Sequence, residues 1–136
     1  MKRRHFFSRL AAVVLLPLAL SNAQAAAEFV DYEPGLIKQR LAAGETLLVD
    51  YAATWCSTCA RQARVIESLR AENPVYDEQL TFVKVDWDTY QNHEVTTSRN
   101  IPRRSTLLVL KDDKELGRIV AGTAKEDIKA LLDKGL

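Results

Sequence analysis

An apolar segment leads directly into two cysteines at the start of a helical pattern, and this junction constrains the fold most. Residues 46–51 have the character of a buried strand. Residues 56–70 repeat apolar side chains at helical spacing and begin with Cys56 and Cys59, the only cysteines of the sequence. The expected inward residues are Ala60, Ala63, Ile66 and Leu69, and the expected outward residues are Arg61, Arg64 and Arg70. The junction therefore predicts an α/β domain with both cysteines at the beginning of a helix.

The elements around this junction are predicted from residues that start or end helices and from the spacing of apolar side chains. Residues 28–32 are a linker or a short first strand. Pro34 favours the first turn of a helix over residues 34–43. Asn73-Pro74 breaks the cysteine-bearing helix, and residues 80–86 form the next strand.

The second half of the chain completes the sheet. One short helix is expected between residues 88 and 100, followed by strands over residues 106–110 and 115–120. Thr123 and Glu126 form a capping-box pattern that opens a last helix. Its expected inward residues are Ile128, Leu131 and Leu132. This order predicts a central mixed β-sheet of four to five strands, flanked by helices on both faces.

Residues 1–25 have the features of a cleavable signal peptide. Four basic residues precede the apolar run 10–20, and Ala23-Gln24-Ala25 matches a small-x-small cleavage pattern. An apolar run this short cannot span a bilayer of about 30 Å, so no stable membrane insertion is expected after cleavage. Arg3-Arg4 adds a weak twin-arginine character. We therefore expect export to the periplasm and a mature domain over residues 26–136.

Charge argues against nucleic acid as a partner. The whole chain has a net charge of +1, with 19 basic and 18 acidic residues. Four of the basic residues lie within residues 1–25, so the remainder has 15 basic and 18 acidic residues. A basic patch that could follow a phosphate backbone is missing from the sequence.

The position of Cys56 and Cys59 favours redox chemistry. The unpaired N–H groups and the positive dipole end of a helix N-terminus stabilise a thiolate. A free cysteine is about 3% ionised at neutral pH, whereas a pKa of about 7 makes half of it thiolate, the attacking species. Cys59 lies one helical turn further on. We therefore expect Cys56 to attack a disulfide and Cys59 to resolve the mixed disulfide.

A metal site is the alternative use of the same cysteines. A structural zinc site needs four ligands, and His93 is the only histidine beyond residue 25. A complete site would need a carboxylate or a second chain, so no metal ligand is assigned. A dimeric metal- or iron–sulfur-binding module that uses Cys56 and Cys59 stays open.

The segment Val49-Asp50-Tyr51-Ala52-Ala53-Thr54-Trp55-Cys56-Ser57-Thr58-Cys59 resembles the active-site segment of thioredoxins, over about residues 45–132 in all. The resemblance implies a thioredoxin fold and a thiol–disulfide oxidoreductase that needs no cofactor. Asp50 matches the family's buried acid and Lys84 its lysine neighbour, so both are expected in the catalytic group. Burial raises the pKa of such a carboxyl, which can then accept the Cys59 proton directly or through water.

The sequence departs from this family opposite the cysteines. Thioredoxins carry a cis-proline where this chain has Ser105, between Arg104 and Thr106. Placing Pro102 there instead would bury two unpaired arginines. A cis bond before serine costs about 2.5–4 kcal/mol, so a trans Arg104–Ser105 bond is predicted. In the family this loop pairs with the substrate strand, which implies substrate binding by Trp55, Arg104, Ser105 and Thr106. The proline is also thought to keep metals off the sulfurs, so its absence keeps the cluster alternative open.

The resemblance and the signal segment together predict a periplasmic protein that reduces protein disulfides. Its expected partners are oxidised client proteins and a transmembrane thiol reductase that supplies electrons. An oxidase or isomerase of the same fold is the first alternative, because sequence alone does not set the redox potential.

Overall fold

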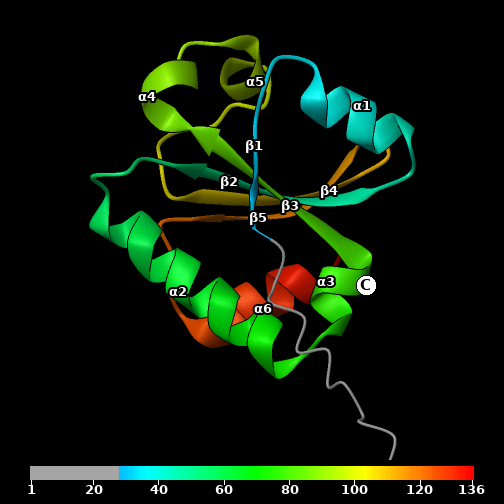
Figure 1. Cartoon of the computed structure of the whole chain (residues 1–136). Coiled ribbons are helices and arrows are strands. Elements are labelled where there is room, and N and C mark those ends of the chain that lie inside the picture. The colour runs from blue at the N-terminus through cyan, green and yellow to red at the C-terminus, as the bar shows by residue number, and fades with distance from the viewer. Residues whose placement is uncertain (1–27) are drawn as a thin grey trace, which may run out of the picture.

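The computed structural model describes residues 28–136, which form one five-stranded sheet with helices on both faces (Figure 1). The predicted signal segment, residues 1–25, lies outside the described residues. The elements in chain order are β1 (Val30–Asp31), α1 (Leu36–Ala42), β2 (Thr46–Ala52), α2 (Ser57–Glu72), α3 (Val75–Gln79), β3 (Leu80–Asp86), α4 (Trp87–Tyr90), α5 (Glu94–Thr97), β4 (Thr106–Lys111), β5 (Lys114–Val120) and α6 (Lys125–Asp133). The predicted mixed sheet is confirmed.

The strand order β1-β3-β2-β4-β5 places β2 at the centre of the sheet. β3 is parallel to both β1 and β2, whereas β4 and β5 extend the sheet in antiparallel fashion beyond β2. The parallel pairing of β2 and β3 requires the crossover that α2 and α3 provide. β4 and β5 form a hairpin, as their adjacency in the sequence predicts.

The two faces of β2 pack against different helices, because successive side chains of a strand point to opposite faces. Leu47, Val49 and Tyr51 join an apolar cluster with residues of α1 and α5. Leu48 belongs to the cluster on the other face, formed with α2, α3 and α6 (Figure 1). Asp50 has the same parity as Leu48, so its carboxyl faces the α2 side of the sheet.

Helix α2 starts one residue later and ends two residues later than predicted, and its buried face is rotated. Ala60 is exposed, so its predicted inward position is wrong, and Ala63 is half-buried. Cys59 must face the sheet for its sulfur to meet Cys56, and one residue further along the helix then points about 100° away. Arg61 and Arg64 are exposed, as predicted. The buried residues are Cys59, Gln62, Ile66, Leu69 and Arg70.

The predicted outward position of Arg70 is also wrong. Its side chain is only 3% exposed and donates to a carboxylate oxygen of Asp77 at 2.5 Å. The guanidinium lies 4.2 Å from the centre of the Phe82 ring. Asn73-Pro74 ends α2 as expected, but the chain then forms the unpredicted helix α3, which carries Asp77 back to the end of α2. This partner makes burial of the arginine tolerable.

Two short helices stand where one was predicted between residues 88 and 100. Asp86 caps α4 by accepting the backbone N–H of Thr89 at 3.0 Å. His93 caps α5 through Nδ1, which accepts the N–H of Val95 at 3.1 Å. Each side-chain cap defines a separate helix start.

The predicted capping box at the start of α6 is absent. The cap residue is Ala124, and it makes no side-chain hydrogen bond. Thr123 lies one position too early for its hydroxyl to serve as the cap. The inward residues Ile128, Leu131 and Leu132 are confirmed. Within residues 28–136, no helix has both the length and the apolar character needed to cross a membrane.

Candidate active site

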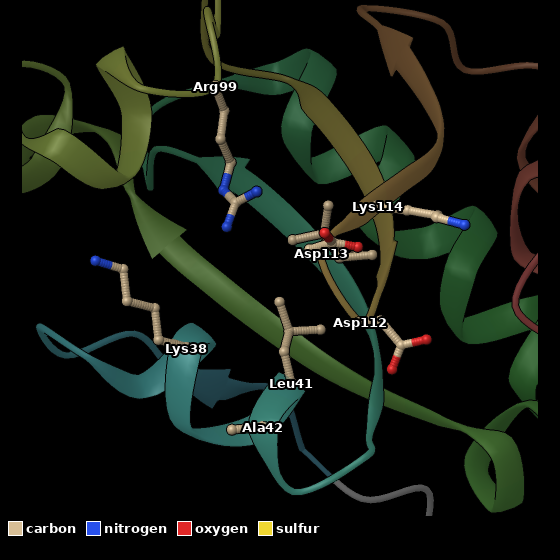
Figure 2. A pocket seen from close by; sticks show the side chains of 8 residues that line it. Lys38, Leu41, Ala42, Arg99, Asp112, Asp113 and Lys114 are labelled. Atoms are coloured by element: carbon tan, nitrogen blue, oxygen red, sulfur yellow. The ribbon is translucent and has the colours of Figure 1, made fainter.

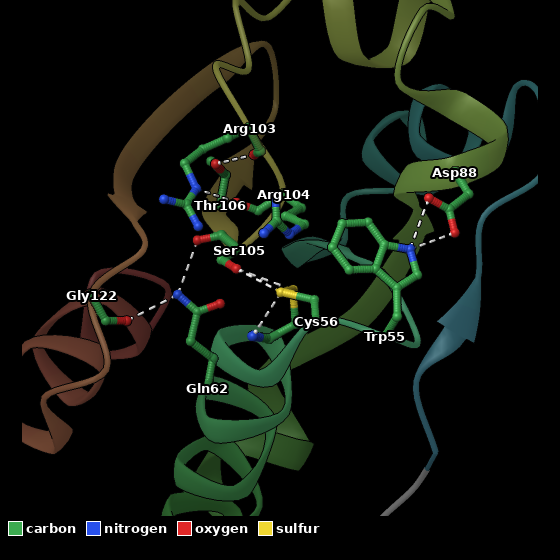
Figure 3. The surroundings of a disulfide bond; sticks show 10 residues. Trp55, Cys56, Gln62, Asp88, Arg103, Arg104, Ser105, Thr106 and Gly122 are labelled. Carbon is green, nitrogen blue, oxygen red and sulfur yellow. Dashed lines mark hydrogen bonds between the residues drawn. A yellow bond between two sulfur atoms is a disulfide. The ribbon is translucent and has the colours of Figure 1, made fainter.

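Cys56 and Cys59 form a disulfide at the start of α2, as the strand-to-helix junction predicts (Figure 3). Cys56 is the cap residue of this helix, and its own N–H donates to the Ala53 carbonyl at 3.2 Å. The Cys56 sulfur accepts the backbone N–H of Cys59 at 3.2 Å. Both cysteines are buried. A helix-terminal N–H aimed at a sulfur stabilises negative charge there, so the site favours a thiolate in the reduced state.

Asp50 lines the same pocket as the two cysteines, on the face of β2 that α2 covers. Its side chain is buried, and its Oδ1 has no hydrogen-bond partner among residues 28–136. A pocket of about 230 Å³ is lined by Asp50, both cysteines and the small side chains Ala52 and Ala60, among others. Burial raises the pKa of Asp50 from 3.8 to about 7, although the charge of Lys84 lowers it in part. The carboxyl can therefore exchange a proton near neutral pH.

Lys84 is a neighbour of Asp50 without being its ion-pair partner. The two residues are in register on the parallel strands β2 and β3. The Lys84 side chain is half exposed, and its Nζ lies 3.7 Å from a carboxylate oxygen of Asp31. Lys84 thus acts on Asp50 through its charge and shares the wall of the same pocket.

Ser105 stands directly opposite the cysteines. Its Oγ lies 3.2 Å from the Cys56 sulfur and 3.1 Å from the Cys59 sulfur. Residues 28–136 contain no cis peptide bond, so the predicted trans Arg104–Ser105 bond is confirmed. Pro102 is exposed and precedes β4 by several residues, which agrees with the choice of Ser105.

Trp55 and Arg104 form one surface unit beside the disulfide (Figure 3). Trp55 is 59% exposed, and its ring Nε1 donates to both carboxylate oxygens of Asp88 at 2.9 and 3.1 Å. The Arg104 guanidinium lies 4.4 Å from the centre of the Trp55 ring, a cation–π distance. Thr106 is buried and donates its hydroxyl to the Arg103 carbonyl at 2.7 Å. The structure therefore brings two of the four predicted substrate residues to the surface together and turns the Thr106 hydroxyl inward.

The comparison with known protein families fits this geometry. Residues 32–134, most of the chain, match the family model described as Thioredoxin. The chain belongs to the thioredoxin family. With the disulfide at the head of α2, the protein is a thiol–disulfide oxidoreductase of the thioredoxin fold, as predicted.

Individual relatives support the same assignment. A thioredoxin from Staphylococcus aureus is 34% identical over 89 residues, which are 65% of this chain and 81% of the relative. The crystal structure of Trxlp from Edwardsiella tarda EIB202 superposes with a TM-score of 0.65 at 29% identity, over 75% of this chain and 97% of that one. Fasciola hepatica thioredoxin gives a TM-score of 0.58 at 28% identity, over 74% of this chain and 91% of its own.

Two residues of this thioredoxin site were missed by the sequence reasoning. Gln62 is fully buried, and its Nε2 donates to the carbonyls of Ser105 at 3.0 Å and Gly122 at 2.9 Å. An amide within an otherwise apolar helical stripe is a signal that could have revealed it. Asp88, which holds the Trp55 ring, lies in a polar stretch with no pattern that singles it out.

A larger cavity of this thioredoxin, about 610 Å³, lies beside the β4–β5 turn (Figure 2). This turn is at the end of β2 away from the cysteines. The cavity is formed between α1 and the β4–β5 turn, and its rim includes Lys38, Arg99 and Lys114 together with Asp112 and Asp113. Residues 28–136 contain no group of three or more His, Cys, Asp or Glu side chains that could hold a metal ion.

Proposed function

We propose that this thioredoxin reduces disulfides of client proteins in the bacterial periplasm. The observation that carries the exchange chemistry is Asp50, a buried acid with a pKa of about 7 that shares a pocket with the two cysteines. A carboxyl with this pKa is about half ionised at neutral pH, so it can take up the proton that the second cysteine must lose.

The reaction begins when the Cys56 thiolate attacks one sulfur of a client disulfide. A mixed disulfide forms, and the other client sulfur leaves as a thiolate that takes up a proton. Cys59 passes its proton to Asp50 through water in the shared pocket, and its sulfur then attacks Cys56. The second client sulfur leaves and is protonated. Two electrons and two protons have then passed to the client, and the Cys56–Cys59 disulfide remains.

Each turnover leaves the protein oxidised, so its electrons must be restored. We propose a transmembrane thiol reductase as the donor, because the periplasm is an oxidising compartment. The signal-like segment over residues 1–25 supports export. The backbone of Arg104, next to the buried Ser105, would pair with an extended client segment, while the exposed Trp55 ring offers apolar contact.

The reduction potential of the Cys56/Cys59 pair tests the direction of exchange. The protein is equilibrated anaerobically in glutathione or dithiothreitol buffers, and the oxidised fraction is measured. A potential of about −270 mV supports the reductase, whereas about −120 mV would make the protein a disulfide donor and refute the proposal.

Client capture tests the roles of the two cysteines. Cys59→Ala should accumulate mixed disulfides with periplasmic proteins, because the resolving thiol is gone. Cys56→Ala is the matched control and should accumulate none.

Location is tested by fractionating cells that express the full chain or a chain without residues 2–25. Only the full chain should reach the periplasm.

A further inference from the structure

The Ser105 hydroxyl is placed against both sulfurs of the active-site pair, 3.2 Å from Cys56 Sγ and 3.1 Å from Cys59 Sγ. We propose that this hydroxyl is a catalytic group that donates a hydrogen bond to whichever of the two sulfurs carries the negative charge, and that Gln62 positions it. The inference rests on the thiol–disulfide exchange described above and applies to either direction of exchange.

The backbone holds Ser105 in one orientation. Its N–H donates to the Tyr51 carbonyl at 2.7 Å, and its carbonyl accepts the N–H of Ala121 at 2.8 Å. Its φ of 62° lies in the left-handed region, which non-glycine residues adopt infrequently. Ser105 is fully buried, so water does not compete for the hydroxyl. Neighbouring strands therefore support a costly backbone conformation that directs the side chain at the disulfide.

A hydroxyl suits a pair of sulfurs that exchange charge. It has one proton to donate and two lone pairs to accept with, and it turns freely about its C–O bond. Before the attack on a client, the charge lies on Cys56, and the hydroxyl can donate to it while accepting from the Cys59 thiol. When Cys59 has lost its proton and attacks Cys56, a rotation of the same O–H redirects the hydrogen bond to Cys59.

Gln62 holds the Ser105 backbone from the helix side, through its carbonyl, and so positions the residue that carries the hydroxyl. Its two N–H groups are directed at the carbonyls of Ser105 and Gly122. Both neighbours are acceptors, so only the amide nitrogen of the side chain can face them. Gln62 Oε1 is buried with no hydrogen-bond partner among residues 28–136. A buried amide with one unsatisfied atom is costly, and the two bonds that its nitrogen donates offset that cost.

The test is the rate of Cys56 alkylation by iodoacetamide as a function of pH, with the modified cysteine identified by mass spectrometry on the reduced protein. A hydrogen bond to a charged group shifts an ionisation equilibrium by about ten-fold or more. Ser105→Ala should therefore contain about ten-fold less Cys56 thiolate at pH values where the thiol is mostly protonated. A more basic thiolate is about three-fold more reactive, so alkylation there should be about three-fold slower.

The same reasoning requires the two profiles to cross. At high pH, where Cys56 is fully ionised in both proteins, Ser105→Ala should react about three-fold faster than the wild type, because its thiolate is more basic. A merely looser site would change the rate in the same direction at every pH. The crossing is therefore the signature of a lost hydrogen bond to sulfur.

Ser105→Gly separates the hydroxyl from the backbone, because glycine adopts a positive φ without strain. We expect it to reproduce the crossed profile of Ser105→Ala. Gln62→Leu should give a smaller shift in the same sense. Thr96→Val is the matched control and should keep the wild-type profile. It removes a buried hydroxyl of α5 that donates to the Tyr90 carbonyl of α4.

Two results would overturn the proposal. Wild-type profiles in both Ser105 variants would show that the hydroxyl does not act on the sulfurs. A shift in Ser105→Ala that is absent in Ser105→Gly would assign the effect to backbone conformation. Iodoacetamide reports on the thiolate without a client, so these outcomes are independent of the potential that decides between reductase and oxidase.

Discussion

Asp50→Asn should stabilise the oxidised protein, and the stabilisation should grow as the pH rises. Burial raises the pKa of Asp50 from 3.8 to about 7. The folded state therefore binds more protons than the unfolded state between these two values. Stability that depends on Asp50 falls as the pH rises through this window and levels off above about 7. Asparagine carries no charge at any pH, so the variant escapes this loss.

The size of the effect follows from the separation of the two pKa values. At about 1.4 kcal/mol per pH unit, the ionised carboxyl costs about 4 kcal/mol at pH values above about 7. At about pH 4.5 the same linkage costs about 1 kcal/mol. The asparagine amide brings its own cost of burial, because Asp50 Oδ1 has no partner among residues 28–136, but that cost does not vary with pH.

The assay is urea unfolding of the wild type and Asp50→Asn in the disulfide form, at about pH 4.5 and about pH 8.5. The disulfide keeps Cys56 and Cys59 from titrating. The free-energy difference between the two proteins should be about 3 kcal/mol larger at the higher pH. Asp113→Asn, at an exposed carboxyl in the β4–β5 turn, is the control and should show almost no such change. A change below about 1 kcal/mol in Asp50→Asn would refute the reasoning, because the folded carboxyl would then be as well solvated as the unfolded one.

Lys84→Met removes the charge that lowers the pKa of Asp50, so the free energy of unfolding should continue to fall to a higher pH than in the wild type. If it levels off at the same pH in both proteins, this electrostatic role of Lys84 is contradicted. Arg70→Met should lower the free energy of unfolding in urea by about 2 kcal/mol or more, because it loses the Asp77 ion pair and the contact with the Phe82 ring. A loss below about 0.5 kcal/mol would show that the buried guanidinium contributes little net stability. The Arg104 charge beside Trp55 should give the wild type a several-fold higher kcat/KM for disulfide peptides with acidic residues beside the cysteine than for those with basic residues. Arg104→Glu should reverse this preference. Equal kcat/KM of the wild type for both peptides would exclude it.

Local patterns in the sequence were enough to predict the strands, the main helices and the strand pairing of this protein. The strands and the main helices follow from the spacing of apolar residues, and the parallel and antiparallel pairings follow from whether a helix or a tight turn connects two strands. The position of Cys56 and Cys59 at a helix start is equally local, since it needs only the strand before them and the periodicity after them. The burial of Asp50 followed from the apolar residues that precede it in β2.

The tertiary structure decided which side chains meet. Ser105 reaches sulfurs that are 49 and 46 positions away in the sequence, and Gln62 reaches a carbonyl 60 positions away. Helical periodicity could not predict that Arg70 is buried. Its burial depends on Asp77, which lies in α3, the helix that follows the end of α2. The rotation of α2 and the side-chain contacts across the sheet depend on packing between distant segments. A one-dimensional pattern carries the spacing of residues along an element, but the angle at which that element packs is set by its neighbours.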